Sequence, residues 1–355
     1  MARHRLIHSK FSVDEKGIVR RHSPNYNFIG DRNNGTTFRW GRYLKEDPKS
    51  SPWPELADIS ISNKCSKGCG FCYRDSTTDG GLMTLGQYSK VLDQLTSPVW
   101  GPPFQVALGG GEPTEHPHLI QILKETQKRQ IIANLTTNGY SVSREHIEAF
   151  KKLCGAVAIS TISINPELQA NIQKLISAEI RTNLHFVLSE SSIELAIDIL
   201  RGKFDPELKG LNAIVFLTHK TMGRANSKDN LQSNKKLEMF LSLIDKSQSK
   251  LRFGFDACFV PLLLKYTNID QRFVDSCECG FFSVYVDEKL NVKPCSFAKG
   301  DEWTFDLSRN NFANIWEIKF EPYRNAITRS CTINCGIKDC RGGCLFHESL
   351  NLCKA

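Results

Sequence analysis

Between residues 56 and 250 the sequence alternates short apolar runs with longer amphipathic stretches, and each run is followed by a helix-like segment. The runs expected to be strands are 56–62, 104–111, 131–137, 156–162, 182–189 and 212–219. Regular alternation of this kind predicts parallel strands joined by right-handed helical crossovers. Six units are fewer than the eight of a closed barrel. The sequence therefore predicts an α/β fold with a partial, TIM-like (βα)6 barrel.

The first expected helix shows both the periodicity and a start signal. Its apolar side chains recur at helical spacing, at Leu85, Tyr88, Val91, Leu92 and Leu95. Thr84 and Gln87 stand three positions apart at its start, which predicts a capping box.

Composition divides the chain into three parts. Residues 1–54 are polar and interrupted by Gly, Asn and Pro, which predicts an N-terminal extension with a short hairpin. Residues 55–250 are expected to be the barrel. From 251 to 355 the chain is rich in Cys, Gly and Asn, and we expect a small second domain there, held together by its cysteine ligands.

Bulk properties exclude several classes of protein. The chain has 355 residues, is 40% hydrophobic and carries a net charge of +8 spread along its length. Such dispersed charge mildly favours anionic partners, and no nucleic-acid partner is expected. No apolar run reaches the roughly 18 to 20 residues of a membrane span, and the start has no apolar signal segment. We expect a soluble, cytoplasmic protein without a membrane partner.

The thirteen cysteines are unevenly distributed. Three lie at 65–72 and eight between 277 and 353, while Cys154 and Cys258 stand alone. Stable disulfides are disfavoured in a reducing cytosol, so many spaced cysteines indicate metal or cluster ligation. Cys154 is expected to be a small core residue.

The first group, Cys65, Cys69 and Cys72 in "SNKCSKGCGFCYRDS", directly follows the first expected strand. In parallel α/β folds ligands bind at the carboxyl ends of strands. A structural zinc site normally has four protein ligands, whereas three thiolates on a [4Fe–4S] cluster leave one iron open for a small molecule. A zinc site completed by a distant residue is the alternative.

This C-x3-C-x2-C spacing, with Phe71 before and Tyr73 after the third cysteine, resembles the signature of radical S-adenosylmethionine (SAM) enzymes. The resemblance implies that the amino and carboxylate groups of SAM chelate the open iron. One electron then cleaves the sulfonium, and the resulting 5′-deoxyadenosyl radical abstracts a hydrogen atom from the substrate.

The same resemblance assigns further contacts with SAM. Those residues are Tyr73, Gly110, Gly111 and Glu112 in "GGGEP", Asn138 in "TTNG", Ser160, and Arg224 in "MGRA". Glycines permit close approach of the backbone to a ligand. The alternatives are a simple turn for "GGGEP", ordinary polar residues at strand ends for Asn138 and Ser160, and a solvent-facing side chain for Arg224.

The run "CTINCGIKDCRGGC", with Cys353 after it, resembles the SPASM domain of radical SAM enzymes, which holds two auxiliary [4Fe–4S] clusters. Eight cysteines would ligate both fully. The resemblance implies a first auxiliary cluster on Cys277, Cys279, Cys295 and Cys344, and a second on Cys331, Cys335, Cys340 and Cys353.

The chain departs from the SPASM pattern in three places. One ligand of the cysteine run is shifted by a residue, and Leu290 stands where the family has glycine. Cys277 and Cys279 are close for two ligands of one cluster, so Cys258 could replace one of them. Zinc held by four thiolates remains the alternative for this region.

Oxidative chemistry on a substrate also needs a proton acceptor. Asp256 is our candidate, with Glu278 and Asp287 as alternatives; a solvated or helix-capping carboxylate is the competing interpretation for each. The auxiliary clusters are expected to take up the electron.

The resemblance covers residues 56–353 and extends to maturases of ribosomally made peptides and to anaerobic sulfatase-maturing enzymes. It implies an oxidoreductase that cross-links or otherwise modifies a precursor peptide, with flavodoxin or ferredoxin as reductant. The N-terminal extension or a separate peptide-recognition protein would bind the leader. A radical SAM enzyme acting on a small molecule, and a non-enzymatic iron–sulfur or zinc protein, are the alternatives.

Overall fold

The computed structural model describes residues 10–270, 274–329 and 344–350. Cys331, Cys335, Cys340 and Cys353, and with them the whole predicted second auxiliary site, lie outside these residues. Among the helices that are described, none is both long and apolar enough to span a bilayer.

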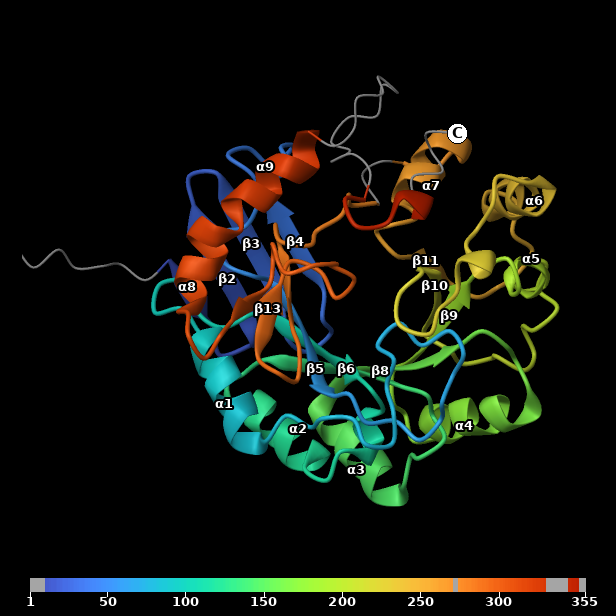
Figure 1. Ribbon diagram of the computed structural model, residues 1–355, viewed down its shortest axis with the longest axis horizontal. Coiled ribbons are helices and arrows are strands. Elements are labelled where there is room, and N and C mark those ends of the chain that lie inside the picture. The colour runs from blue at the N-terminus through green and yellow to red at the C-terminus, as the bar shows by residue number, and fades with distance from the viewer. Residues whose placement is uncertain (1–9, 271–273, 330–343, 351–355) are drawn as a thin grey trace, which may run out of the picture.

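A ten-stranded sheet forms the centre of the molecule, in the order β11-β10-β9-β8-β7-β6-β5-β12-β13-β14 (Figure 1). Six consecutive parallel strands confirm the predicted α/β core. They are β5 (Leu56–Ser62), β6 (Gln105–Gly110), β7 (Ile132–Thr137), β8 (Cys154–Thr161), β9 (Thr182–Leu188) and β10 (Ala213–Thr218).

Helices connect these strands, and Figure 1 shows α1 to α4 running along one side of the sheet. The connecting helices are α1 (Leu85–Gln94), α2 (Leu119–Lys128), α3 (Arg144–Leu153), α4 (Pro166–Ser177), α5 (Ile193–Leu200) and α6 (Lys235–Ile244). Helix α1 buries Tyr88, Val91 and Leu92, as its spacing predicts. The capping box between Thr84 and Gln87 is present in both directions.

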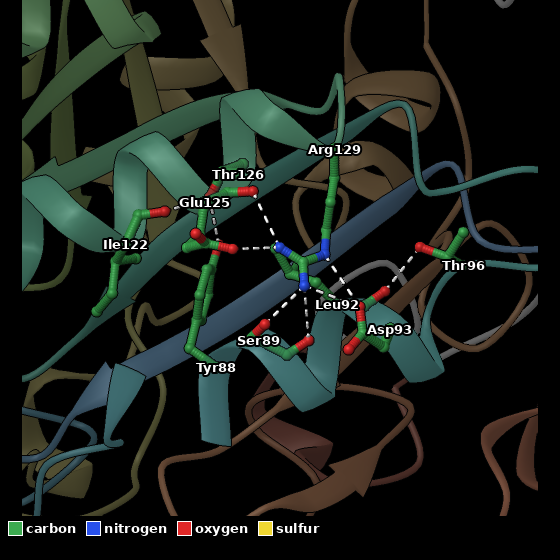
Figure 2. A network of polar contacts seen from close by, with 9 residues as sticks. All are labelled: Tyr88, Ser89, Leu92, Asp93, Thr96, Ile122, Glu125, Thr126 and Arg129. Atoms are coloured by element: carbon green, nitrogen blue, oxygen red, sulfur yellow. Dashed lines mark hydrogen bonds and ion pairs between the residues drawn. The ribbon is translucent and has the colours of Figure 1, made fainter. Parts of the chain in front are cut away.

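The outer layer is fastened by Arg129, the residue that ends α2 (Figure 2). Its guanidinium donates to Asp93 on α1 at 2.8 Å and to Glu125 on α2 at 2.6 Å. It also donates to the Ser89 hydroxyl at 2.6 Å. One side chain therefore ties two neighbouring helices together with charge-assisted bonds.

Residues before the barrel form more structure than the sequence predicts. In place of a short hairpin there is an antiparallel four-stranded sheet of β1 (Phe11–Val13), β2 (Ile18–Ser23), β3 (Tyr26–Asp31) and β4 (Thr37–Trp40). Arg21 of β2 is buried and donates to the carbonyls of Trp53, Pro54 and Pro102. These bonds dock the small sheet against the start of the barrel.

The central sheet also continues past residue 250, across the boundary that composition suggests. Strand β11 (Phe253–Phe255) pairs parallel with β10, and β12 (Ser283–Val286) pairs parallel with β5. Strands β13 (Asn291–Lys293) and β14 (Phe305–Asp306) then follow antiparallel. The cysteine-rich part thus shares one sheet with the barrel. It also contributes α7 (Val260–Tyr266), α8 (Phe312–Asn314) and α9 (Glu321–Arg329).

Candidate functional site

A cavity of about 410 Å³ opens among the parallel strands and the loop that follows β5. It gathers residues that are far apart in the sequence, including almost all of the predicted SAM-binding side chains. Its lining includes Cys65, Cys69, Cys72, Tyr73, Gly110, Gly111, Glu112, Asn138, Ser160 and Asp256. Arg224 is the one predicted cofactor residue that is absent from this wall.

Arg224 instead forms hydrogen bonds with the backbone of the three-cysteine loop. Its guanidinium donates to the carbonyl of Cys69 at 3.1 Å and to that of Ser76 at 2.8 Å. Glu115 fastens the other end of the loop by accepting a hydrogen bond from the Ser66 hydroxyl at 2.6 Å. The three-cysteine loop is therefore pinned by side chains from two distant parts of the barrel.

Gly110, the last residue of β6, and Gly111 after it are required by the close approach of the backbone to this loop. Gly110 has a φ of +113°, and a Cβ atom there would lie 2.1 Å from the carbonyl oxygen of Ser62. A Cβ on Gly111 would lie 2.1 Å from the carbonyl oxygen of Lys64. Glycine thus lets the end of β6 pack directly beneath the chain that leads into Cys65.

Glu112 is buried and satisfied within the protein. Its carboxylate accepts hydrogen bonds from the hydroxyls of Thr114 and Thr137, both at 2.6 Å, and from the backbone N–H of Asn138 at 2.7 Å. Burial raises the pKa of Glu112, and these bonds oppose the rise. Glu112 therefore joins the end of β6 to the end of β7.

The cysteines of the loop lie in surroundings that disfavour a bare thiolate. Burial raises the pKa of both Cys65 and Cys69, and the neighbouring Cys65 and Cys72 add to the rise at Cys69. A metal ligand must give up its proton, and a cation at the cavity would reverse this penalty. Across the described ranges, no three Cys, His, Asp or Glu side chains converge closely enough to chelate one metal ion.

A second cavity of about 210 Å³ adjoins the first, and cysteines from the C-terminal part of the chain line it. It is lined by Cys258, Cys277, Cys279, Cys295 and Cys344. Hydrogen bonding to Cys277 and Cys295 raises the pKa of the Cys279 thiol. The four cysteines predicted for the first auxiliary cluster thus lie together, and Cys258 lies with them.

The wall between the two cavities is built from Lys220, Asp256, Ser296 and Phe297, which line both. Lys220 is buried, and its ammonium group lies 2.7 Å from the Asp256 carboxylate and 4.5 Å from the centre of the Phe297 ring. The Phe297 ring packs against Tyr73 at 4.5 Å between ring centres. This wall is therefore a packed layer with a paired charge inside it.

Of the three candidate proton acceptors, Asp256 alone lines the cavities in the described part of the chain. Glu278 pairs with Arg39 at 2.6 Å. Asp287 accepts hydrogen bonds from Asn291 within the β12–β13 turn. Glu278 is thus engaged in an ion pair and Asp287 in a turn.

Four titratable residues of the cavity were missed by the sequence reasoning: Asp58, His185, His219 and Lys220. Asp58 is the one charged residue of the strand "LADISIS", and this break in an apolar run was the available signal. His185, His219 and Lys220 gave no such signal, because single polar residues near strand ends are common.

Comparison with protein families identifies the region around the first cavity. Residues 59–210 match the model of the Radical SAM superfamily. This stretch runs from β5 to the loop before β10 and includes the three-cysteine loop.

Two curated proteins match the chain over about a third of its length. AlbA of Bacillus subtilis, an antilisterial bacteriocin subtilosin biosynthesis protein, is 28% identical over 120 residues, which cover 33% of this chain and 26% of AlbA. The tungsten-containing aldehyde ferredoxin oxidoreductase cofactor-modifying protein of Pyrococcus furiosus is 25% identical over 113 residues, or 31% of each chain. The matched parts therefore span less than two thirds of either relative.

Solved structures of SuiB from Streptococcus suis share the fold over nearly the whole chain. SuiB bound to its precursor peptide SuiA has a TM-score of 0.73 at 15% identity, and SuiB bound to SAM has 0.72 at 14%. Each alignment covers 97% of both chains. The likeness includes the part beyond residue 250.

Proposed function

Because residues 59–210 form a radical SAM domain, we propose that this chain is an oxidoreductase that abstracts a hydrogen atom from a residue of a ribosomally made precursor peptide. The observation that carries the proposal is the single cavity that joins Cys65, Cys69 and Cys72 to Glu112, Asn138 and Ser160.

In this proposal Cys65, Cys69 and Cys72 hold a [4Fe–4S] cluster, and the walls formed by β6, β7 and β8 hold SAM. A reduced cluster bound there would supply the one electron needed to cleave SAM into methionine and the 5′-deoxyadenosyl radical. Glu112 keeps the ends of β6 and β7 at a fixed separation, and Arg224 keeps the cysteine loop in place. Tyr73 and Phe297 pack together on the side towards the second cavity.

The second cavity would hold the first auxiliary cluster on Cys295, Cys344 and two of Cys258, Cys277 and Cys279. We propose a second auxiliary cluster on Cys331, Cys335, Cys340 and Cys353. Such clusters can accept the electron that the substrate loses, because cluster potentials vary widely with their surroundings. Flavodoxin or ferredoxin is the proposed reductant, and a cytoplasmic location suits oxygen-sensitive clusters.

Asp256 is the proposed acceptor of the proton that the substrate loses. Its carboxylate faces both cavities and is oriented by the Thr218 hydroxyl at 2.8 Å and by Lys220 at 2.7 Å. The proton acceptor would thus lie on the wall shared by the radical site and the electron-accepting site.

A peptide substrate is favoured by the relatives. SuiB was solved with a precursor peptide, and AlbA takes part in bacteriocin biosynthesis. The second relative, a cofactor-modifying protein, favours a small molecule as the alternative substrate. The leader of a peptide would bind the N-terminal sheet or a separate recognition protein.

The function is tested in two steps. Anaerobically reconstituted protein should form 5′-deoxyadenosine from SAM when dithionite is added, and its absence would contradict a radical SAM activity. Co-expression with the short peptides encoded beside the gene, followed by mass spectrometry, should then reveal a peptide that has lost two hydrogens. If no peptide is altered while 5′-deoxyadenosine forms, the small-molecule alternative gains.

A further inference from the structure

Three carboxylates line the main cavity, and two of them are satisfied inside the protein. Glu112 accepts hydrogen bonds from three neighbouring residues. Asp256 accepts them from Thr218 and Lys220. Asp58, on β5, is the third, and within the described chain it receives neither a hydrogen bond nor an ion pair.

The cation nearest to Asp58 is already engaged elsewhere. Arg74 forms an ion pair with Glu288, and its guanidinium stands over the Tyr285 ring at 5.8 Å. Tyr73 and Tyr285 also face Asp58, and burial raises the pKa of both far above neutrality, so they carry no charge. The groups around Asp58 therefore leave its carboxylate without a partner of opposite charge in contact.

Across the cavity, His185 on β9 does not compensate for this charge either. Burial lowers the pKa of His185 to about 4, so the imidazole is neutral at physiological pH. Lys220 is occupied by Asp256. Among the described residues that line the cavity, Asp58 is therefore the carboxyl group without a partner of opposite charge in contact.

Asp58 is half-buried and lines the cavity, and partial loss of hydration without a hydrogen-bond donor from the protein is costly for a carboxylate. Burial raises the pKa of Asp58 to about 7, which reflects that cost. A ligand that supplies the missing partner would explain why a destabilising carboxylate stands in the middle of this strand. The ligand should carry a cation with N–H donors.

We propose that Asp58 is a specificity determinant of the substrate site and that its carboxylate binds a protonated amine or guanidinium of the substrate. The proposal rests on the proposed function, because it places the residue to be modified in the cavity where SAM is cleaved. It narrows the substrate to a peptide with a basic side chain at or beside the modified position.

SAM also carries positive charge, but the position of Asp58 favours the substrate. Asp58 stands four residues before the end of β5, about 13 Å along the strand. The three cysteines follow that end, and the predicted contacts with SAM lie at or beyond strand ends, except for Tyr73, whose ring is near Asp58. SAM binding therefore should not depend on Asp58.

The test measures binding of blocked amino acids to the cluster-loaded, oxidised protein in the presence of SAM, by saturation-transfer NMR. The two probes are Nα-acetyl-lysine N-methylamide and its neutral analogue Nα-acetyl-norleucine N-methylamide. Wild type should bind the lysine probe about 10- to 100-fold more tightly than the analogue, as expected for a charged hydrogen bond. Asp58→Asn should lose this preference and keep its affinity for SAM.

Asp301→Asn is the control for loss of one negative charge, since Asp301 is exposed and far along the chain. It should keep the preference for lysine. Asp58→Leu is a second variant, to be used if Asp58→Asn disturbs the fold. Cluster content and circular dichroism show whether each Asp58 variant is folded.

The inference is overturned if wild type binds both probes equally, if Asp58→Asn keeps the preference, or if Asp58→Asn loses SAM instead. Its failure is separable from that of the proposed function, which depends on formation of 5′-deoxyadenosine by wild type without any probe.

Discussion

Arg129 and Asp58 are charged residues on opposite sides of the same sheet, and the protein treats them differently. Arg129, in the outer layer, donates to Asp93, Glu125 and Ser89 (Figure 2). Asp58, on the inner wall, receives no such bond from the described residues. A network that is complete within the chain serves stability, whereas a charge left without a partner points to a ligand.

The largest expected effect lies on the inner side, at the cysteine loop. Replacing Cys65, Cys69 or Cys72 by Ala should lower the iron content by about four atoms per chain and reduce 5′-deoxyadenosine formation to background, because three thiolates are needed to hold the cluster. Iron analysis and chromatography of the products measure both. Cys154→Ser, at the start of β8 and outside both cavities, should retain both properties; equal losses in all four variants would contradict the assignment.

The next effect concerns the stability cost of Asp58. The folded chain keeps this proton up to about pH 7, and the unfolded chain keeps it only to about pH 4. Wild-type stability therefore falls as the pH rises through this range. Asp58→Asn does not titrate, so its advantage over wild type should grow by about 2 kcal/mol between pH 5.5 and pH 8.

Melting temperatures of the cluster-loaded proteins, measured anaerobically at both pH values, check this prediction. The difference in melting temperature between Asp58→Asn and wild type should be a few degrees larger at pH 8 than at pH 5.5. A difference that stays constant with pH would mean that Asp58 has a partner after all, and the contrast with Arg129 would disappear.

A smaller effect is expected in the outer layer. Arg129→Ala removes charge-assisted bonds between α1 and α2 from a partly exposed position, which should cost about 1 to 2 kcal/mol. Arg129→Lys should recover part of the loss, since an ammonium group can still reach one carboxylate. Thermal melting measures stability, and SAM cleavage well below the melting point should stay at the wild-type rate. A slower cleavage would show that the two sides are not independent.

The smallest effect concerns Leu290, in the turn between β12 and β13, where the strain lies in the backbone. Leu290 has a φ of +68°, a left-handed conformation that favours glycine. Its side chain is partly buried against the core. Leu290→Ala loses packing and keeps the strain, whereas Leu290→Gly loses packing and relieves it. Glycine should therefore be more stable than alanine by about 1 kcal/mol, as measured by melting; the reverse order would exclude strain at this turn.

The repeating pattern of the sequence was sufficient for the core of the fold and for the position of the three-cysteine loop after its first strand. Strand β5 has the predicted bounds, the other five predicted strands agree to within two residues, and the Thr84 capping box is present. These features depend on neighbours in sequence, such as helical spacing, caps and the position of a loop after a strand. The family resemblance assigned Glu112 and Arg224 to SAM, and that assignment stays a prediction. The contacts observed give each a structural role that the sequence did not predict: Glu112 joins the ends of β6 and β7, and Arg224 holds the cysteine loop.

Features that depend on contacts between distant residues were decided by the tertiary structure alone. Pairing of β12 with β5 joins the cysteine-rich part to the barrel sheet, and packing brings Cys258 beside Cys277 and Cys295. The sequence shows that Asp58 is an acid within an apolar strand, but only the folded chain shows that no cation among the described residues contacts it. The burial of a side chain and its hydrogen-bond and ion-pair partners depend on residues from several elements, so the sequence of one strand does not determine them.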